Sequence, residues 1–205
     1  MNALVGSALD SAHDRLVLGR RVRVLAKWMA ALVPADARVL DVGSGDGELA
    51  AEVMRLRPDV RVEGIDVLVR PDTRIPVTPF DGAHIPGGAK SVDVVMLVDV
   101  LHHADDPVAL LAEAGRVCGR AVIVKDHLTD PLFAVPTLRF MDRVGNARHG
   151  VRLPYRYLSR HEWMTAIDGA GLRVDEWVPH LGLYPPPASW LFERGLHFAA
   201  RFVPA

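Results

Sequence analysis

The stretch Val39-Leu40-Asp41-Val42-Gly43-Ser44-Gly45-Asp46-Gly47 decides the fold of this chain. An apolar strand runs directly into a turn with three glycines at alternate positions, and the helix-patterned segment Leu49–Leu56 follows. Glycine lets the backbone adopt positive φ and approach a ligand closely, and the start of a helix offers unpaired N–H groups. The stretch therefore predicts a ligand-binding strand–turn–helix unit. A turn without a ligand is the alternative, and the surrounding pattern weakens it.

Apolar runs alternate with helical patterns on both sides of this turn. The expected strands are Arg38–Val42, Val60–Val67, Ile75–Phe80, Val92–Val98 and Ala121–Val124, and a second helical pattern covers Val108–Val117. This alternation is typical of a doubly wound, mostly parallel α/β sheet. Leu172–Val178 is a further predicted strand. For Leu196–Val203 we favour a strand over a short amphipathic helix, with a rigid turn at Pro185-Pro186-Pro187 before it.

Helix-end signals support this pattern. Apolar residues at helical spacing predict an amphipathic helix over Leu16–Leu32, ended by Pro34. Asp106-Pro107 offers an N-cap with proline in the first turn, and Ser159–Glu162 forms a capping box for a helix that Gly171 can close. The least regular stretch, His127–Leu158, is too long for an ordinary connection, so we expect a functional insertion there.

Composition limits the class of protein. The 205 residues are 50% apolar with a formal net charge of -1, which suits one domain over residues 1–205 and does not suit a nucleic-acid partner. Cys118 is the single cysteine, so no internal disulfide or cysteine zinc site is expected, and a cytoplasmic location is the default. Residues 1–14 lack an export signal, and the apolar run Val94–Val98 is too short to insert in a membrane.

Acidic residues end the two strands that follow the glycine turn. Asp66 stands where a carboxylate can accept both hydroxyls of a ribose, and Asp81 stands where an acceptor can meet an adenine amino group. Glu48 occupies the position of the third glycine of a dinucleotide-binding turn, where a carboxylate would repel a pyrophosphate. The turn and the two acids therefore predict a nucleoside ligand.

These segments resemble the class I S-adenosylmethionine-dependent methyltransferases, especially their small-molecule branch. Leu40–Gly47 looks like motif I, Asp66 like the ribose acid, Phe80–Gly82 like the adenine segment, and Val92–His103 like the motif near the donor's methionine moiety. The resemblance covers Leu16–Gly171. It implies a seven-stranded Rossmann-like sheet with an antiparallel last strand, and S-adenosylmethionine bound by Asp41, Gly43, Ser44, Gly45, Asp66, Val67, Asp81, Gly82, Val98, Asp99 and His102.

Methyl transfer needs alignment of donor and acceptor, and a general base only where the acceptor carries a proton. The candidates for that base are His103, Asp126 and His127, with Asp99 and His102 beside them at the ends of the fourth and fifth strands. A structural role is at least as good an interpretation for His102 and His103. No metal is expected, because the His and Asp residues lack i, i+4 ligand spacing. Asp93 begins the fourth strand at the opposite end of the sheet.

Residues 127–158 are expected to cap the substrate, and residues 1–34 to form an N-terminal helical cap over the donor. Arg148, Arg152 and Tyr155 are the candidate substrate-binding residues, in a segment that also holds Arg139, Arg143 and Arg156, so the acceptor is expected to carry a carboxylate or phosphate. A solvated helix face is the equal alternative. For the helix Leu16–Leu32, a basic membrane-surface role is the weaker alternative to a lid.

Two other functions compete with an S-adenosylmethionine-dependent methyltransferase that acts on a small molecule. One is an inactive S-adenosylmethionine-binding protein that acts through partners. The other is a nicotinamide-dependent oxidoreductase, which Glu48 and the lack of a catalytic tyrosine–lysine pair disfavour. A nucleic-acid methylase is disfavoured because Val98–Leu101 stands where amino-group methylases carry Asn-Pro-Pro-aromatic. The acceptor atom and the oligomeric state are left open.

Overall fold

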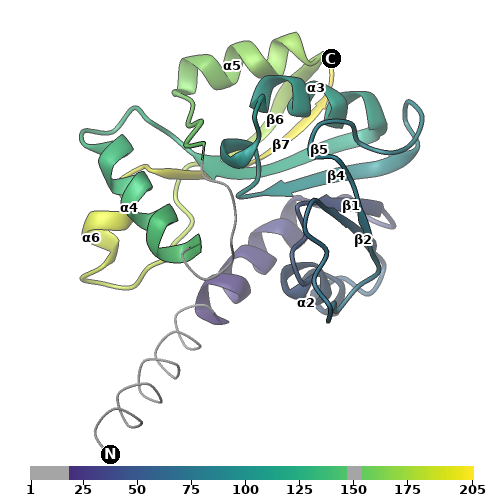
Figure 1. Cartoon of the computed structure of the whole chain (residues 1–205), viewed down its shortest axis with the longest axis horizontal. Helices are drawn as coiled ribbons and strands as arrows, with labels where there is room; N and C mark the ends of the chain where they lie inside the picture. Colours follow the sequence, from purple (N-terminus) through teal and green to yellow (C-terminus); the bar gives the residue numbers. More distant parts are fainter. Residues whose placement is uncertain (1–18, 147–153) are drawn as a thin grey trace, which may run out of the picture.

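The computed structural model describes residues 19–146 and 154–205, and its centre is a seven-stranded sheet (Figure 1). The strand order is β3-β2-β1-β4-β5-β7-β6. The strands are β1 (Arg38–Val42), β2 (Arg61–Asp66), β3 (Val77–Pro79), β4 (Val92–Val98), β5 (Cys118–His127), β6 (Leu172–Val178) and β7 (His197–Pro204). The first five pair in parallel, while β7 runs antiparallel to β5 and β6. The predicted fold class is confirmed, including the strand at residues 196–203.

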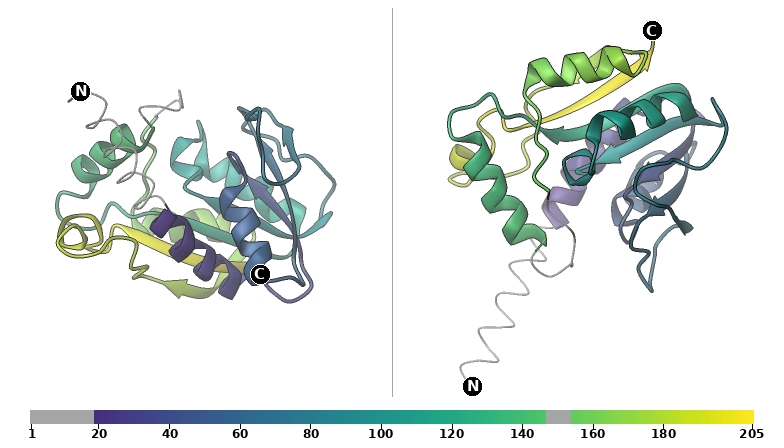
Figure 2. Two further views of the ribbon diagram at one scale, coloured as in Figure 1. Left: turned by 90° about the horizontal axis from the view of Figure 1, so that it is seen from below. Right: turned by 45° about the horizontal axis from the view of Figure 1, so that its top comes forward.

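Helices cover both faces of the sheet (Figures 1 and 2). On one face lie α3 (Pro107–Val117) and α5 (Arg160–Gly169), and on the other lie α2 (Glu48–Leu56) and the N-terminal helix, described from residue 19 to 32. The N-terminal helix buries Leu25, Met29 and Leu32 against the sheet, as its apolar stripe predicts. The described part of this helix is therefore packed on the domain.

The central strands are buried on both faces because helices cover each side. Val95 and Leu97 pack toward α3 and α5, while Val94 and Met96 pack toward the N-terminal helix and α2. Such strands carry nearly continuous apolar runs, which is the pattern of residues 92–98. Polar residues at the ends of these strands are therefore exceptions to the apolar pattern and are candidates for a functional role.

The predicted caps are present. Asp106 accepts hydrogen bonds from the backbone N–H groups of Val108 and Ala109, and Ser159 and Glu162 form a reciprocal capping box. Gly171 follows α5 with a φ of 67°, a conformation that favours glycine. These local signals could be interpreted correctly because each depends on residues close in sequence.

The segment His127–Leu158 is more regular than its sequence predicts, because it contains α4 (Ala134–Asn146). Among the α4 side chains that the structure describes, only Ala134, Leu138 and Asp142 are buried, while Phe140 and Val144 are exposed. The residues of α4 do have a helical periodicity of apolar and polar side chains, but Pro136 in its first turn obscures this signal in the sequence. Two short elements were also not predicted, η1 (Leu101–His103) and α6 (Ser189–Phe192). No helix in the described residues is long and apolar enough to cross a bilayer.

Candidate active site at the carboxyl ends of the central strands

The glycine turn between β1 and α2 has an open backbone. Gly43, Gly45 and Gly47 have φ values of 71°, 60° and 75°. A side chain at Gly43 or Gly47 would collide with Val100 or Ile75, because an added Cβ would lie 2.5 Å from either residue, whereas a Cβ on Gly45 would meet no atom within 4 Å. Gly45 therefore leaves free space in which a ligand can reach the turn.

Asp66 ties the end of β2 to this turn. Its carboxylate accepts hydrogen bonds from the backbone N–H of Gly45 and of Leu68, each at 2.8 Å. Asp41 is buried nearby, and burial together with the charge of Asp66 raises the pKa of Asp41 to about 8. Asp41 is therefore largely protonated at neutral pH, and the Asp66 carboxylate is held by two backbone N–H groups.

The segment after β3 lies next to Asp66. The N–H of Phe80 donates to the backbone oxygen of Asp66, and a Cβ on Gly82 would lie 3.1 Å from the exposed Val67. The Asp81 carboxylate accepts hydrogen bonds from the N–H groups of Ala83 and His84, and these bonds lower its pKa. The structure brings the segment to the expected place, with the Asp81 carboxylate used by its own loop.

Ser44 holds a different position from the one that a ligand-binding hydroxyl would need. Its Oγ is buried against Gly64, where an added Cβ would lie only 2.3 Å away, and it has no hydrogen-bond partner among the described residues. Any contact of Ser44 with a ligand would therefore go through its backbone.

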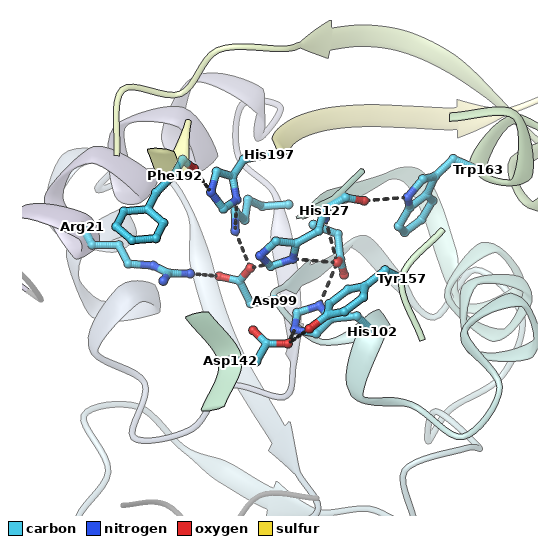
Figure 3. A network of polar contacts seen from close by, with 11 residues as sticks. Arg21, Asp99, His102, His127, Asp142, Tyr157, Trp163, Phe192 and His197 are labelled. Carbon is cyan, nitrogen blue, oxygen red and sulfur yellow. Dashed lines mark hydrogen bonds and ion pairs between the residues drawn. The ribbon is translucent and has the colours of Figure 1, made fainter. Parts of the chain in front are cut away.

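An ion cluster around the buried Lys125 lies at the ends of β4 and β5, with Asp99 and Arg21 partly exposed. Lys125 Nζ donates to one oxygen of Asp99, and Arg21 of the N-terminal helix donates to the other (Figure 3). Burial opposes ionisation of Asp99, but Lys125 and Arg21 hold its pKa well below the usual value. Burial lowers the pKa of Lys125, and Asp99 partly offsets this effect. The cluster joins the N-terminal helix to the two central strands.

A histidine–aspartate pair lies beside this cluster (Figure 3). His102 Nδ1 is 2.7 Å from Asp126 Oδ1, and His102 Nε2 is 3.5 Å from Asp142 Oδ2. Burial alone would lower the pKa of His102, but the carboxylates of Asp126 and Asp142 raise it above its ordinary value. His102 and Asp126 are fully buried, so their contact is shielded from solvent.

Other histidines surround the pair. His127 Nδ1 lies 3.2 Å from Asp126 Oδ1, and burial together with Lys125 lowers the pKa of His127 to about 4. Burial and the charge of His102 likewise lower the pKa of His103 to about 4, and His103 Nδ1 has no hydrogen-bond partner in the described residues. At neutral pH both rings are therefore uncharged.

Helix α4 and the segment after it complete the cluster. Tyr157 donates its hydroxyl to Asp142 of α4, and its ring stacks on His102 with centroids 5.6 Å apart. Tyr155, a predicted substrate-binding residue, lies at the edge, with its ring 6.2 Å from that of Tyr157 and under the Arg139 guanidinium. Arg148 and Arg152 lie outside the described residues.

Sequence reasoning did not select several residues of this site: Arg21, Lys125, Asp142, Tyr157 and His197. Lys125 carried a signal, because a lysine directly after the apolar run Ala121–Val124 must be buried or paired. His197 lies opposite His127 in the β5–β7 pairing, and its Nδ1 is 3.5 Å from Lys125 Nζ. The pairing of these two strands could not be derived from sequence spacing.

Two sets of side chains have donor atoms close enough for a metal ion. The donor atoms of each set lie within 4.8 Å of one another. The first set is Asp99, His102 and His127, and the second is His102, His103 and Asp142. In the first set Asp99 is already paired with the cations of Lys125 and Arg21, which would repel a divalent ion. In the second set Tyr157 donates to Asp142. The expectation that no metal is bound stays a prediction.

The chain is similar to known methyltransferases in sequence and in structure. The family model described as "Methyltransferase domain" matches residues 13–176. No curated protein matches the chain. Among solved structures, a chain from the complex of the Haloferax volcanii Trm112 methyltransferase activator with a protein assigned as a methyltransferase is 18% identical, with a TM-score of 0.70 and 95% of both chains covered.

Two further solved methyltransferases are also similar. The mitomycin 7-O-methyltransferase MmcR is 25% identical with a TM-score of 0.63, and 89% of the present chain covers 54% of it. CalO1, a methyltransferase of calicheamicin biosynthesis solved with S-adenosylhomocysteine, is 24% identical with a TM-score of 0.65, and 99% of the present chain covers 58% of it. The present chain thus spans little more than half of either enzyme.

The ion cluster gives a stability prediction. Replacing Asp99 by asparagine leaves the fully buried Lys125 without its carboxylate and close to Arg21. We expect Asp99→Asn to lower the free energy of unfolding by roughly 3–5 kcal/mol in urea denaturation.

Two controls accompany this variant. Asp175→Asn breaks a half-exposed pair with Arg201 and should cost about 1 kcal/mol or less. Adding Lys125→Met to Asp99→Asn removes the unpaired buried charge and should restore part of the loss. If Asp99→Asn and Asp175→Asn are equally stable, the ion cluster of Asp99, Lys125 and Arg21 does not stabilise the fold as proposed.

Proposed function

Since this chain belongs to the methyltransferase domain family and uses S-adenosylmethionine as its methyl donor, we propose that it methylates a small molecule bound beside His102. One observation carries the proposal: the open glycine turn with Asp66 and the pair His102–Asp126 lie at the carboxyl ends of neighbouring parallel strands. Ligands of open α/β sheets bind at these ends. The acceptor would then be next to both the donor site and a buried titratable group.

The residues at the turn suit the donor. Asp66 can accept hydrogen bonds from ribose hydroxyls, and the open space at Gly45 gives a ligand access to the backbone. The exposed Val67 and the adjacent Gly82 offer an apolar edge for a purine ring. When bound, S-adenosylmethionine supplies a methyl group on a positively charged sulfur.

His102 is the side chain best placed to accept a proton. Sequence reasoning grouped it with the donor site and proposed His103, Asp126 and His127 for catalysis. Asp126 orients His102 through Nδ1, while Nε2 lies 3.5 Å from Asp142 Oδ2, so the acceptor hydroxyl would take the place of the Asp142 carboxylate beside Nε2. The carboxylates of Asp126 and Asp142 raise the pKa of His102 above its ordinary value, and a more basic histidine accepts a proton more readily. We therefore assign His102 as base and Asp126 as the residue that positions it.

The acceptor that fits a histidine base is a phenol or an enol. In the proposed reaction His102 Nε2 takes the proton of the acceptor hydroxyl while that oxygen bonds to the transferred methyl group. The sulfur keeps the electron pair of the broken C–S bond and becomes a neutral thioether. Burial of His102 and His127 limits the access of water. An anionic group on the acceptor stays a prediction, because Arg148 and Arg152 lie outside the described residues.

Donor binding is tested by calorimetry with S-adenosylhomocysteine. Asp66→Ala should weaken binding at least about ten-fold, since two hydrogen bonds to ribose hydroxyls are worth about 1.4 kcal/mol or more. Asp81→Asn should change the affinity only a few-fold, because that carboxylate is held by its own loop. Thermal unfolding checks that both variants fold. Equal affinities for the wild type and Asp66→Ala would contradict the donor site.

The assignment of the base is tested with labelled donor and a panel of phenols and enols. We expect His102→Asn to lower kcat about 10²–10⁴-fold, the usual contribution of a general base. Its affinity for S-adenosylhomocysteine should stay within a few-fold of the wild type. His103→Asn is the matched control, and its kcat should fall less than about ten-fold. A wild type that binds the donor but methylates nothing would identify an inactive binding protein.

The role of Asp126 is tested by the pH profile of kcat. A base must be uncharged, so kcat should rise with pH through the pKa of His102, which lies above the ordinary 6.5. Asp126→Asn removes the negative charge that raises this pKa, and the rise should therefore move to lower pH. If the profile keeps its position while kcat falls, Asp126 has only a structural role.

A further inference from the structure

Helices α4 and α6 lie together at one end of the molecule (Figure 1), and large apolar side chains are exposed on and beside them. Leu132 and Trp190 are 75% and 72% exposed, the two highest values among the large hydrophobic side chains that the structure describes. The α4–α6 surface is defined by Leu132, Phe133, Phe140, Val144, Trp190 and Leu191, all of them exposed. Exposed apolar side chains that gather on neighbouring helices are typical of an interaction site.

The two helices present this surface as one unit. The rings of Phe140 and Phe192 stack with an interplanar angle of 8° and centroids 6.4 Å apart. Arg194 donates to the backbone oxygens of Leu132 and Leu191 and to Thr137 Oγ1. An apolar groove of about 410 Å³ runs between the helices along Phe133, Phe140 and Leu191. The apolar side chains are therefore held in place by contacts within the protein.

The charges around this surface are mainly positive. Arg139 and Arg143 are exposed on α4, and Arg194 is exposed after α6. Asp142 of α4 is buried toward His102, and Glu193 accepts a hydrogen bond from the N–H of Tyr184. Within 131–144 and 188–195 the described residues contain no exposed carboxylate, and the exposed Asp130 just before this stretch accepts a hydrogen bond from the N–H of Arg160. The surface thus combines apolar side chains with a rim of arginines.

We propose that the α4–α6 surface docks on an anionic lipid bilayer. Tryptophan and phenylalanine favour the boundary between headgroups and acyl chains, and arginines attract anionic headgroups. A second copy of the chain fits less well, because a symmetric interface would bring the same arginines together. Docking goes beyond the proposed methyl transfer and does not depend on it, since every residue of the surface lies outside the donor site.

Docking would also place the membrane next to the candidate active site. The buried face of α4 carries Asp142, whose carboxylate lies 3.5 Å from His102 Nε2, while the exposed face carries Phe140 and Val144. One helix therefore contacts both the proposed lipid surface and the proposed base. An apolar acceptor dissolved in the bilayer would be close to the site.

The test is co-sedimentation of the full chain with two kinds of vesicle, phosphatidylcholine alone and phosphatidylcholine with phosphatidylglycerol. The chain should sediment with the anionic vesicles, less so as salt is added, and stay in solution with phosphatidylcholine alone. Trp190→Ser with Leu191→Ser should lower the bound fraction at least ten-fold. Arg139→Gln with Arg143→Gln should lower it several-fold and reduce the effect of salt.

Val108→Ser is the matched control, because Val108 is exposed on α3 and does not belong to the α4–α6 surface. This variant should bind anionic vesicles as the wild type does. Circular dichroism and S-adenosylhomocysteine affinity show whether each variant is folded. The proposal is overturned if the wild type stays in solution with anionic vesicles, or if the Trp190/Leu191 variant binds like the wild type. It is also overturned if the wild type forms a dimer that this variant abolishes, which would assign the surface to a second copy.

Discussion

The pairing of Asp99 with Lys125 and Arg21 holds the candidate active site together. It connects the ends of β4 and β5 to the N-terminal helix, three elements far apart in sequence. A lysine inside an apolar sheet is costly unless a carboxylate meets it, and a carboxylate buried there needs a cation. The contact therefore constrains both strand ends, and the neighbouring His102–Asp126 pair forms in the space that they define.

Much of the fold could be predicted because its signals are local. The glycine turn, the apolar runs of β4 and β5 and the capping box at Ser159 depend on residues close in sequence. The position of Asp66 at the turn followed from the parallel order of strands, and Gly45 confirms it through a direct hydrogen bond. Helix α4 was not predicted, although its residues have a helical periodicity, because Pro136 lies in its first turn and the apolar Phe140 and Val144 are exposed.

The site residues at the ends of the strands could be predicted from the sequence, but the residues that contact them could not. Asp99, His102 and Asp126 could be placed by strand order, but their contacts with Arg21, Asp142 and Tyr157 require segments that only the folded chain brings together. The local environment also gives the two histidines different pKa values. Asp126 raises the pKa of His102, whereas burial lowers that of His127, so adjacent histidines suit different roles.

The central claim is that the turn at Gly45 with Asp66, and the cluster at Asp99 and His102, form one donor-and-acceptor site. A crystal structure of the chain with S-adenosylhomocysteine tests it most directly. The account predicts the ribose at Asp66 and the sulfur facing the space beside His102. Density for the ligand at another place on the sheet, or a sulfur directed away from the ends of β4 and β5, would contradict it.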